Sequence, residues 1–140
     1  CYALCASPEY LEKMGTPATL EDLQQHEFLQ YGLGKTSTLT LTDAQGKKHN
    51  HTIDAKIKAT NGEFLVDLAV KGQGIVFIPT FIAYKRLAKG ELVPILEQYQ
   101  LPTLNAYAVY PKNRFLSQRC RHLIDFIAER FGDDPYWDKF

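Results

Sequence analysis

The sequence predicts an α/β fold, and three observations support this prediction. Segments with the apolar spacing of strands alternate along the chain with segments that have the spacing of helices. The run Ile75–Ile78 is continuously apolar, which is typical of a strand buried on both faces of a sheet. The chain has 140 residues, of which 45% are hydrophobic, and this is enough to bury a core.

The first half of the chain contains strand patterns separated by turns and short helices. Ser7 precedes and Gly15 follows a short helical segment, as expected of its two caps. Residues 38–42 alternate between polar and apolar, which indicates a strand with one face in water, and the turn Asp43–Gly46 leads into a partner strand. The predicted elements are a strand over 2–6, a helix over 9–14, a helical turn over 19–23, and strands over 27–31, 38–42, 47–53 and 56–59.

The second half begins with a helix whose start has the T-x-x-E form of a capping box. In that motif Thr60 and Glu63 satisfy each other's backbone donors. The predicted elements are a helix that follows Thr60 and stops at Gly72, a strand over 75–78, a helix from Pro79 to Lys89, a short strand over 92–95, a strand over 105–110 and a helix over 117–131. The first of these helices is expected to bury Phe64, Leu65, Leu68 and Ala69, and the last carries an apolar stripe of Cys120, Leu123, Ile124, Ile127 and Phe131.

Composition and charge exclude several classes of protein. Lys plus Arg and Asp plus Glu both number 16, so the chain lacks the positive excess of a protein that grips nucleic acid over its whole surface. No apolar run approaches the roughly 20 residues of a membrane-spanning helix, so we expect no membrane partner. The three cysteines include no C-x-x-C pair, which argues against a disulfide framework or zinc ribbon and favours a reducing compartment. No signal-peptide pattern opens the chain, and we expect it to be a piece of a longer protein.

The glycines of Gly72-Gln73-Gly74 resemble part of a dinucleotide-binding loop, but their context differs. They follow a helix and precede a strand, whereas the true fingerprint follows a strand and opens a helix. Phe77 also stands where the third glycine would be. We therefore expect these glycines to end the helix.

Histidine and cysteine residues suggest two further kinds of chemistry. His49 and His51 share one face of a strand and could bind a metal, although a solvated edge strand is the favoured interpretation. Cys5 could be a nucleophile paired with one of the chain's histidines (His26, His49, His51 or His122), but it lies in an apolar strand, where buried cysteine is usually inert. We expect no catalytic residue, no metal and no cofactor.

Positive charge gathers before and within the start of the last helix, at Lys112, Arg114, Arg119 and Arg121. Because cations at a helix N-terminus oppose the helix dipole, an anion or an acidic partner could bind there. The favoured interpretation is a solvated face whose charge is balanced by Asp125, Glu129, Asp133 and Asp134.

The helix start Thr60-Asn61-Gly62 is the strongest candidate for ligand contact. It follows a strand, so its free N–H groups lie at the carboxyl end of a sheet, where α/β proteins bind ligands. Gly62 would let a ligand approach the backbone closely. The alternative is a helix cap with no binding role.

An ordered set of short segments runs through almost the whole chain. It consists of Leu4–Leu11, Gly15–Pro17, Leu20–His26, Ala59–Asn61, Val70–Ile75, Ile78–Pro79, Gly90–Val93, Ala108–Pro111, Asp125–Ile127 and Phe131–Trp137. In this order and spacing the set closely resembles the carboxyl-terminal part of the effector-binding domain of LysR-type transcriptional regulators. The resemblance implies the second lobe of a type 2 periplasmic-binding-protein-like fold, plus the returning strand and C-terminal helix of the first lobe. Residues 1–105 would form effector-binding lobe II, and residues 106–140 would cross back into lobe I.

The same resemblance implies a site and partners. A small, anionic effector would bind in the cleft between the lobes, and the second lobe would contact it through the loop Tyr31-Gly32-Leu33 and the helix start Thr60-Asn61-Gly62. Such regulators are homo-oligomers in the cytoplasm. They bind DNA through an upstream domain whose pattern this sequence does not contain.

Two other functions compete with this one. A lobe of an extracytoplasmic solute-binding protein of a transporter would share the fold, and an upstream helix-turn-helix pattern would exclude it. An enzyme is disfavoured because no nucleophile is paired with a base in any recognisable motif.

Overall fold

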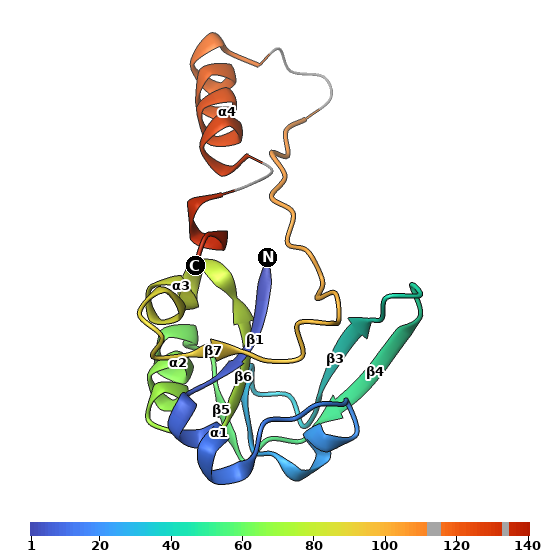
Figure 1. The fold of residues 1–140 in the computed structure, drawn as a ribbon. Coiled ribbons are helices and arrows are strands. Elements are labelled where there is room, and N and C mark those ends of the chain that lie inside the picture. Colours follow the sequence, from blue (N-terminus) through green and yellow to red (C-terminus); the bar gives the residue numbers. More distant parts are fainter. Residues whose placement is uncertain (112–115, 133–134) are drawn as a thin grey trace.

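The computed structural model describes residues 1–111, 116–132 and 135–140, and its centre is a mixed five-stranded sheet (Figure 1). The strand order is β5-β2-β6-β1-β7. These strands are β1 (Tyr2–Ala6), β2 (Phe28–Tyr31), β5 (Ile57–Ala59), β6 (Ile75–Pro79) and β7 (Val93–Pro94). Strand β2 runs parallel to β5 and β6, whereas β1 runs antiparallel to β6 and β7. The carboxyl ends of β2, β5 and β6 therefore share one edge of the sheet.

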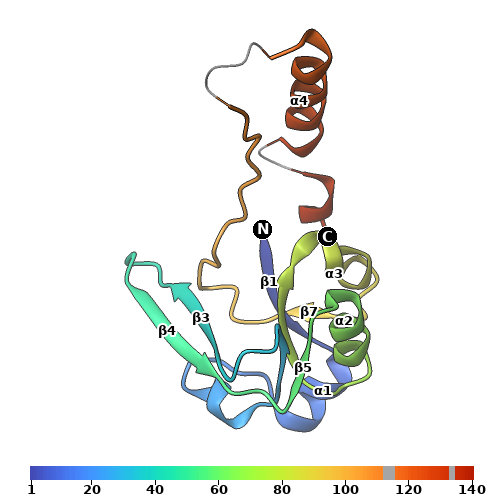
Figure 2. The same cartoon turned by 180° about the vertical axis from the view of Figure 1, so that it is seen from behind.

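Different elements cover the two faces of the sheet (Figures 1 and 2). Helices α2 (Gly62–Val70) and α3 (Thr80–Ala88) pack on one face. The other face is covered by α1 (Pro8–Met14), the 3₁₀ turn η1 (Asp22–Gln25) and the antiparallel hairpin of β3 (Ser37–Thr42) and β4 (Lys48–Ile53). Successive residues of each central strand thus enter different cores: Leu4, Phe28 and Ile75 face the hairpin, and Cys5, Leu29 and Val76 face the helices.

The local signals around α1 and α3 are confirmed. The Ser7 hydroxyl accepts a hydrogen bond from the N–H of Tyr10 at 3.2 Å, and Gly15 ends α1 with a positive φ of 85°. Pro79 precedes α3, and Gly90 lies just past its end. The helical turn expected over 19–23 lies slightly later, at Asp22–Gln25, where the Asp22 carboxylate accepts hydrogen bonds from the N–H groups of residues 18 and 19.

The predicted capping box at the start of α2 is wrong. Asn61, not Thr60, is the N-cap, and its side-chain oxygen accepts a hydrogen bond from the N–H of Phe64 at 3.1 Å. The buried face of α2 differs accordingly. Phe64 is 50% exposed, Leu68 is only partly buried, and Val66 is buried in addition to Leu65 and Ala69.

The glycines after α2 have two separate roles. Gly72 has a φ of 71° and ends the helix, as expected. Gly74 belongs to a close approach of two chain segments, because a Cβ on it would lie 2.6 Å from the carbonyl oxygen of Glu27. That oxygen accepts the N–H of Ile75 at 2.9 Å, which begins the pairing of β6 with β2.

The strand predicted over 105–110 is wrong, because this segment has no helix or strand. Tyr107 is 80% exposed and Val109 is 92% exposed. A strand requires a neighbouring strand to pair with its backbone groups, and within the described residues no strand lies beside this segment.

The last predicted helix is confirmed as α4 (Gln118–Phe131), capped by the hydroxyl of Ser117. None of its residues is buried, and its apolar stripe is solvent-exposed except at Ile124, which is partly buried. The turn η2 (Tyr136–Asp138) follows and packs on α3 (Figure 2). Arg119 and Arg121 are exposed, whereas Lys112, Arg114, Asp133 and Asp134 lie outside the described residues. In the ranges that the structure describes, no helix combines the length and apolar character required to cross a membrane.

Candidate ligand-binding edge of the sheet

The structure brings the two predicted site segments together. Strands β2 and β5 are parallel neighbours, and Tyr31 lies opposite Ala59 at the end of this pair. The N–H of Gly32 donates a hydrogen bond to the carbonyl of Ala59 at 2.8 Å. The loop after β2 and the helix start after β5 are therefore joined at the carboxyl edge of the sheet, which we call the β2–β5 edge.

The first turn of α2 supplies polar groups to this edge. Asn61 uses its side chain to cap the N–H of Phe64, and its carbonyl accepts the N–H of Leu65 at 3.3 Å. The N–H groups of Gly62 and Glu63 belong to the first helical turn, which offers them no acceptor within the helix. Thr60 and Asn61 are exposed, so a ligand can reach their side chains.

Gly62 does not serve the role expected from the sequence. It is buried, and a Cβ at this position would lie 2.8 Å from Cδ1 of Ile82 and 3.2 Å from Cδ1 of Ile78. The absence of a side chain thus lets α2 pack closely on α3 and β6, and no open space for a ligand adjoins its α-carbon. Thr60 and Asn61 remain the accessible members of the predicted helix start.

Two residues that the sequence analysis missed hold the loop after β2. The side-chain N–H of Gln30 donates to the carbonyl of Gly34 at 2.9 Å, and the Lys58 ammonium donates to the same carbonyl at 3.2 Å and also to that of Lys35. Gln30 is only 4% exposed, and among the described residues its side-chain oxygen has no hydrogen-bond partner. The available signal was a glutamine directly after the apolar residues Phe28 and Leu29, within a predicted strand.

The loop itself presents apolar side chains to solvent. Tyr31 is 58% exposed and Leu33 is 73% exposed, while the loop backbone is held by Gln30 and Lys58. A fixed backbone with exposed apolar side chains beside free helix N–H groups can bind a molecule that has both an apolar part and an anionic group.

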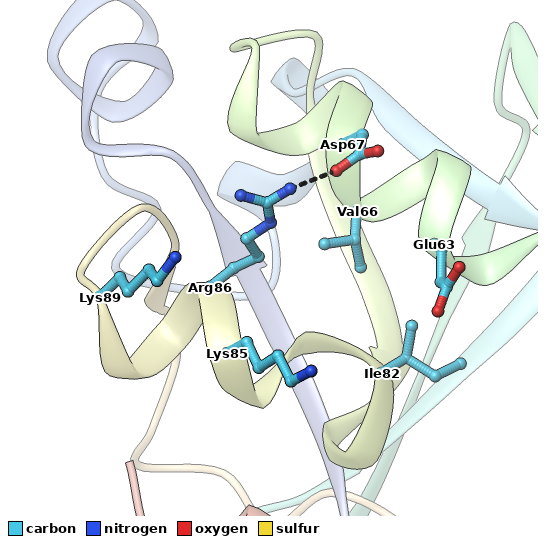
Figure 3. Close-up of a pocket in the computed structure, with 7 residues that line it drawn as sticks. All are labelled: Glu63, Val66, Asp67, Ile82, Lys85, Arg86 and Lys89. Carbon is cyan, nitrogen blue, oxygen red and sulfur yellow. Dashed lines mark hydrogen bonds and ion pairs between the residues drawn. The ribbon is translucent and has the colours of Figure 1, made fainter.

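A separate groove of about 360 Å³ lies between α2 and α3 (Figure 3). It is lined by Glu63, Val66, Asp67, Ile82, Lys85, Arg86 and Lys89. Its most central cation is already paired, because Arg86 donates to Asp67 at 2.9 Å and to Glu91 at 2.7 Å, and these hydrogen bonds raise the pKa of the guanidinium. The groove contains none of the predicted site residues.

The other sequence candidates have structural explanations. Burial raises the pKa of Cys5 to about 12, so this thiol is not a nucleophile near neutral pH. His49 bonds to the Asp43 carboxylate at 2.7 Å, and His51 packs against the ring of Phe28. The expected edge strand is confirmed, because among the described strands β4 has only β3 as a neighbour, but both histidines are half-buried on its inner face rather than fully solvated. In the part of the chain that is described, no three histidine, cysteine, aspartate or glutamate side chains gather as metal ligands would.

Comparisons with known proteins agree on one family. The model of the LysR substrate binding domain matches residues 2–132. The HTH-type transcriptional regulator CrgA of Neisseria meningitidis serogroup B is 36% identical over 135 residues, which are 95% of this chain and 44% of CrgA. The HTH-type transcriptional activator TtdR of Escherichia coli is 30% identical over 130 residues, covering 89% of this chain and 40% of TtdR.

Solved structures give the same result. The regulatory domain of CrgA from Neisseria meningitidis matches with a TM-score of 0.75 and 35% identity, covering 94% of this chain and 64% of that domain. The cumene hydroperoxide-treated regulatory domain of AphB from Vibrio vulnificus matches with a TM-score of 0.76 and 25% identity, covering 91% of this chain and 63% of that one. Compared with the full-length curated relatives CrgA and TtdR, the chain spans less than half of their length.

Proposed function

Because the chain belongs to the LysR substrate-binding domain family, we propose that it binds a small anionic effector at the β2–β5 edge and is part of a transcriptional regulator. The hydrogen bond from Gly32 to Ala59 carries this proposal. It joins the loop Tyr31–Leu33 to the helix start Thr60–Asn61, so one molecule can contact both segments. Thr60 and Asn61 offer polar side chains, and Tyr31 and Leu33 offer apolar surface.

The preference for an anion follows from the helix start. The first turn of α2 directs N–H groups and the positive end of the helix dipole toward the edge. The Lys58 ammonium also lies nearby, where it holds the loop carbonyls and pairs with the Asp54 carboxylate at 3.5 Å. A carboxylate near Thr60 and Asn61 would thus replace water as the acceptor of these donors.

The proposed arrangement of the whole regulator rests on its relatives. Residues 1–105 would be effector-binding lobe II, and residues 106–140 would return to lobe I. The exposed stripe of α4 supports this division, because the CrgA regulatory domain is longer than this chain and includes residues that could cover such a stripe. DNA binding through an upstream domain, homo-oligomerisation and a cytoplasmic location complete the proposal, since the relatives are HTH-type transcriptional regulators.

The competing functions have less support. The relatives are named as transcriptional regulators, which points to a non-enzymatic regulator and does not favour a lobe of a transporter's solute-binding protein. The zero net charge predicts that this chain alone binds DNA weakly and without sequence preference. Tight, sequence-selective binding in an anisotropy titration at about physiological salt would contradict the assignment of DNA binding to another domain.

The site is tested by mapping small anions onto the chain. Amide resonances of the isotope-labelled protein are followed during titration with sulfate, acetate, succinate and salicylate, and with the uncharged amides of the three carboxylates. We expect at least one anion to shift the amides of residues 31–33 and 61–63, while its amide counterpart does so much more weakly. Shifts that cluster in the α2–α3 groove, or no shift at the β2–β5 edge with any probe, would refute the proposed site.

A further inference from the structure

The loop after β2 is held by side chains from two neighbouring strands. Gln30 on β2 and Lys58 on β5 lie directly opposite each other in the parallel pair. Phe28, two residues before Gln30, packs toward the hairpin, so Gln30 lies on the hairpin face of the sheet. Ile57 and Ala59 pack toward the helices, so Lys58 between them also lies on the hairpin face. The two side chains therefore reach the loop from the same side.

These side chains bind adjacent carbonyl groups of the loop. The side-chain N–H of Gln30 donates to the carbonyl of Gly34 at 2.9 Å. The Lys58 ammonium donates to the same carbonyl at 3.2 Å and also to the carbonyl of Lys35. Its third partner is the Asp54 carboxylate at 3.5 Å, so each of the three N–H groups of the ammonium has an acceptor. We call the hydrogen bonds from Gln30 and Lys58 to the loop carbonyls the loop anchor.

The loop anchor leaves one buried polar atom without a partner. Gln30 is buried, and within the described residues its side-chain oxygen accepts no hydrogen bond. Burial of an unpaired amide oxygen destabilises a fold. In Gln30→Met the side chain keeps a similar length without that oxygen, and the carbonyl of Gly34 keeps Lys58 as a donor. The stability of the fold therefore does not require an amide at position 30, and the amide acts on the loop instead.

The loop anchor fixes the backbone that carries the apolar part of the β2–β5 edge. Tyr31 and Leu33 are both exposed, so burial does not hold their side chains in place. The backbone between them is held where the N–H of Gly32 donates to the carbonyl of Ala59, and the loop anchor holds the two carbonyls that follow. The helix start, by contrast, is positioned by α2 and makes none of the anchor's hydrogen bonds.

We propose that Gln30 and Lys58 are positioning residues that set the preference of the β2–β5 edge for anions with an apolar body. This inference rests on the proposed function, in which the helix start binds the anionic group and the loop contacts the rest of the molecule. Loss of the loop anchor leaves the helix start in place but lets Tyr31 and Leu33 move away from the ligand. Selectivity for an anion with an apolar body over a small anion then falls, while the fold keeps its stability.

The affinities of the isotope-labelled protein for salicylate and acetate test this proposal. Both are carboxylates, but only salicylate has an apolar ring. The Kd values come from the amide shifts at the β2–β5 edge, and the ratio of the acetate Kd to the salicylate Kd measures selectivity. Gln30→Met and Lys58→Met each remove one half of the loop anchor. The matched controls are Gln73→Met, which removes an exposed amide that donates to the carbonyl of Lys71, and Lys56→Met, which removes a nearby cation and its ion pair.

We expect both anchor variants to lower the Kd ratio by roughly 2- to 10-fold, the effect of one lost hydrogen bond, and both controls to keep the parent ratio. Without ligand, hydrogen exchange of the Gly32 amide should accelerate by a similar factor in the anchor variants. The Tm of Gln30→Met should equal or exceed that of the parent. Lys58→Arg can still donate to both loop carbonyls and should restore the ratio that Lys58→Met loses.

The possible outcomes distinguish this inference from the proposed function. If no anion shifts the β2–β5 edge of the parent, the binding site is refuted and this inference with it. If anions bind but Gln30→Met and Lys58→Met keep the parent ratio, the positioning role is overturned and the site stands. A Tm of Gln30→Met below that of the parent, or unaltered exchange of the Gly32 amide in both anchor variants, would also overturn the positioning role.

Discussion

Replacing Asn61 separates the capping role of this side chain from its proposed role in binding. Asn61→Ala removes the hydrogen bond to the N–H of Phe64, whereas Asn61→Asp keeps an oxygen acceptor and adds a negative charge. An anion already bound by the helix start would be repelled by that charge. Asn61→Ala should therefore lower stability, whereas Asn61→Asp should preserve stability and weaken the binding of an anion.

The expected magnitudes follow from the cap and the helix dipole. Loss of the cap in Asn61→Ala should destabilise the protein by about 1 kcal/mol, which lowers the Tm by roughly 4 °C. Asn61→Asp should be neutral or stabilising by about 0.3–1 kcal/mol, because the added charge lies at the N-terminus of α2. Its affinity for an anionic ligand should fall, since a hydrogen bond to a charged group contributes about 1.5–3 kcal/mol, or roughly 10- to 150-fold in Kd.

Thermal unfolding and titration of the same samples provide the assay. The ligand is whichever carboxylate shifts the amides of the β2–β5 edge most strongly, and Thr60→Ala is the control for stability, because Asn61 makes the cap bond. A Tm for Asn61→Asp as low as that for Asn61→Ala would refute the capping argument. An unchanged Kd in Asn61→Asp would refute the binding site and leave Asn61 as a cap alone.

Three other predictions concern the close approach of β2 and β6, the hairpin and α4. Gly74→Ala should destabilise by more than about 3 kcal/mol in urea unfolding, because its Cβ would meet a backbone oxygen at 2.6 Å, whereas Gly90→Ala, with positive φ but open space, should cost about 1 kcal/mol. Equal effects would contradict the steric argument. Burial lowers the pKa of His51, so the unfolded state binds a proton before the folded state does as the pH falls below about 6.5. The contribution of His51 to stability is therefore present above that pH and lost below it. His51→Gln should make the free energy of unfolding depend less steeply on pH in this range. An unaltered slope would show that other groups cause it. Sedimentation equilibrium should show association of the 15.9 kDa chain through the exposed apolar stripe of α4, because burial of each such side chain contributes about 1.5–3 kcal/mol. The double substitution Leu123→Ser and Ile127→Ser should reverse this association. A monomer at every concentration would contradict this.

The sequence by itself determined most of the elements and their order. The caps Ser7 and Gly15, the alternation in 38–42 and the apolar run Ile75–Ile78 each act over a few residues, and the structure confirms the helix, hairpin strand and central strand that they predict. The family resemblance also selected the two segments, Tyr31–Leu33 and Thr60–Gly62, that meet at the β2–β5 edge, although Gly62 serves packing there. Such signals can be recognised in the sequence because their physical causes are local.

Only the tertiary structure decided the features that depend on distant partners. Gly62 is required by the side chains of Ile78 and Ile82, and Gln30 acts through a loop carbonyl four residues away that only the turn of the chain brings within reach. The segment 105–110 has the composition of a strand but no neighbouring strand in the described chain, so its local preference is not realised. A strand obtains its hydrogen bonds from other chain segments, and a glycine is required where other segments leave no room for a side chain. The local sequence pattern does not specify which segments these are.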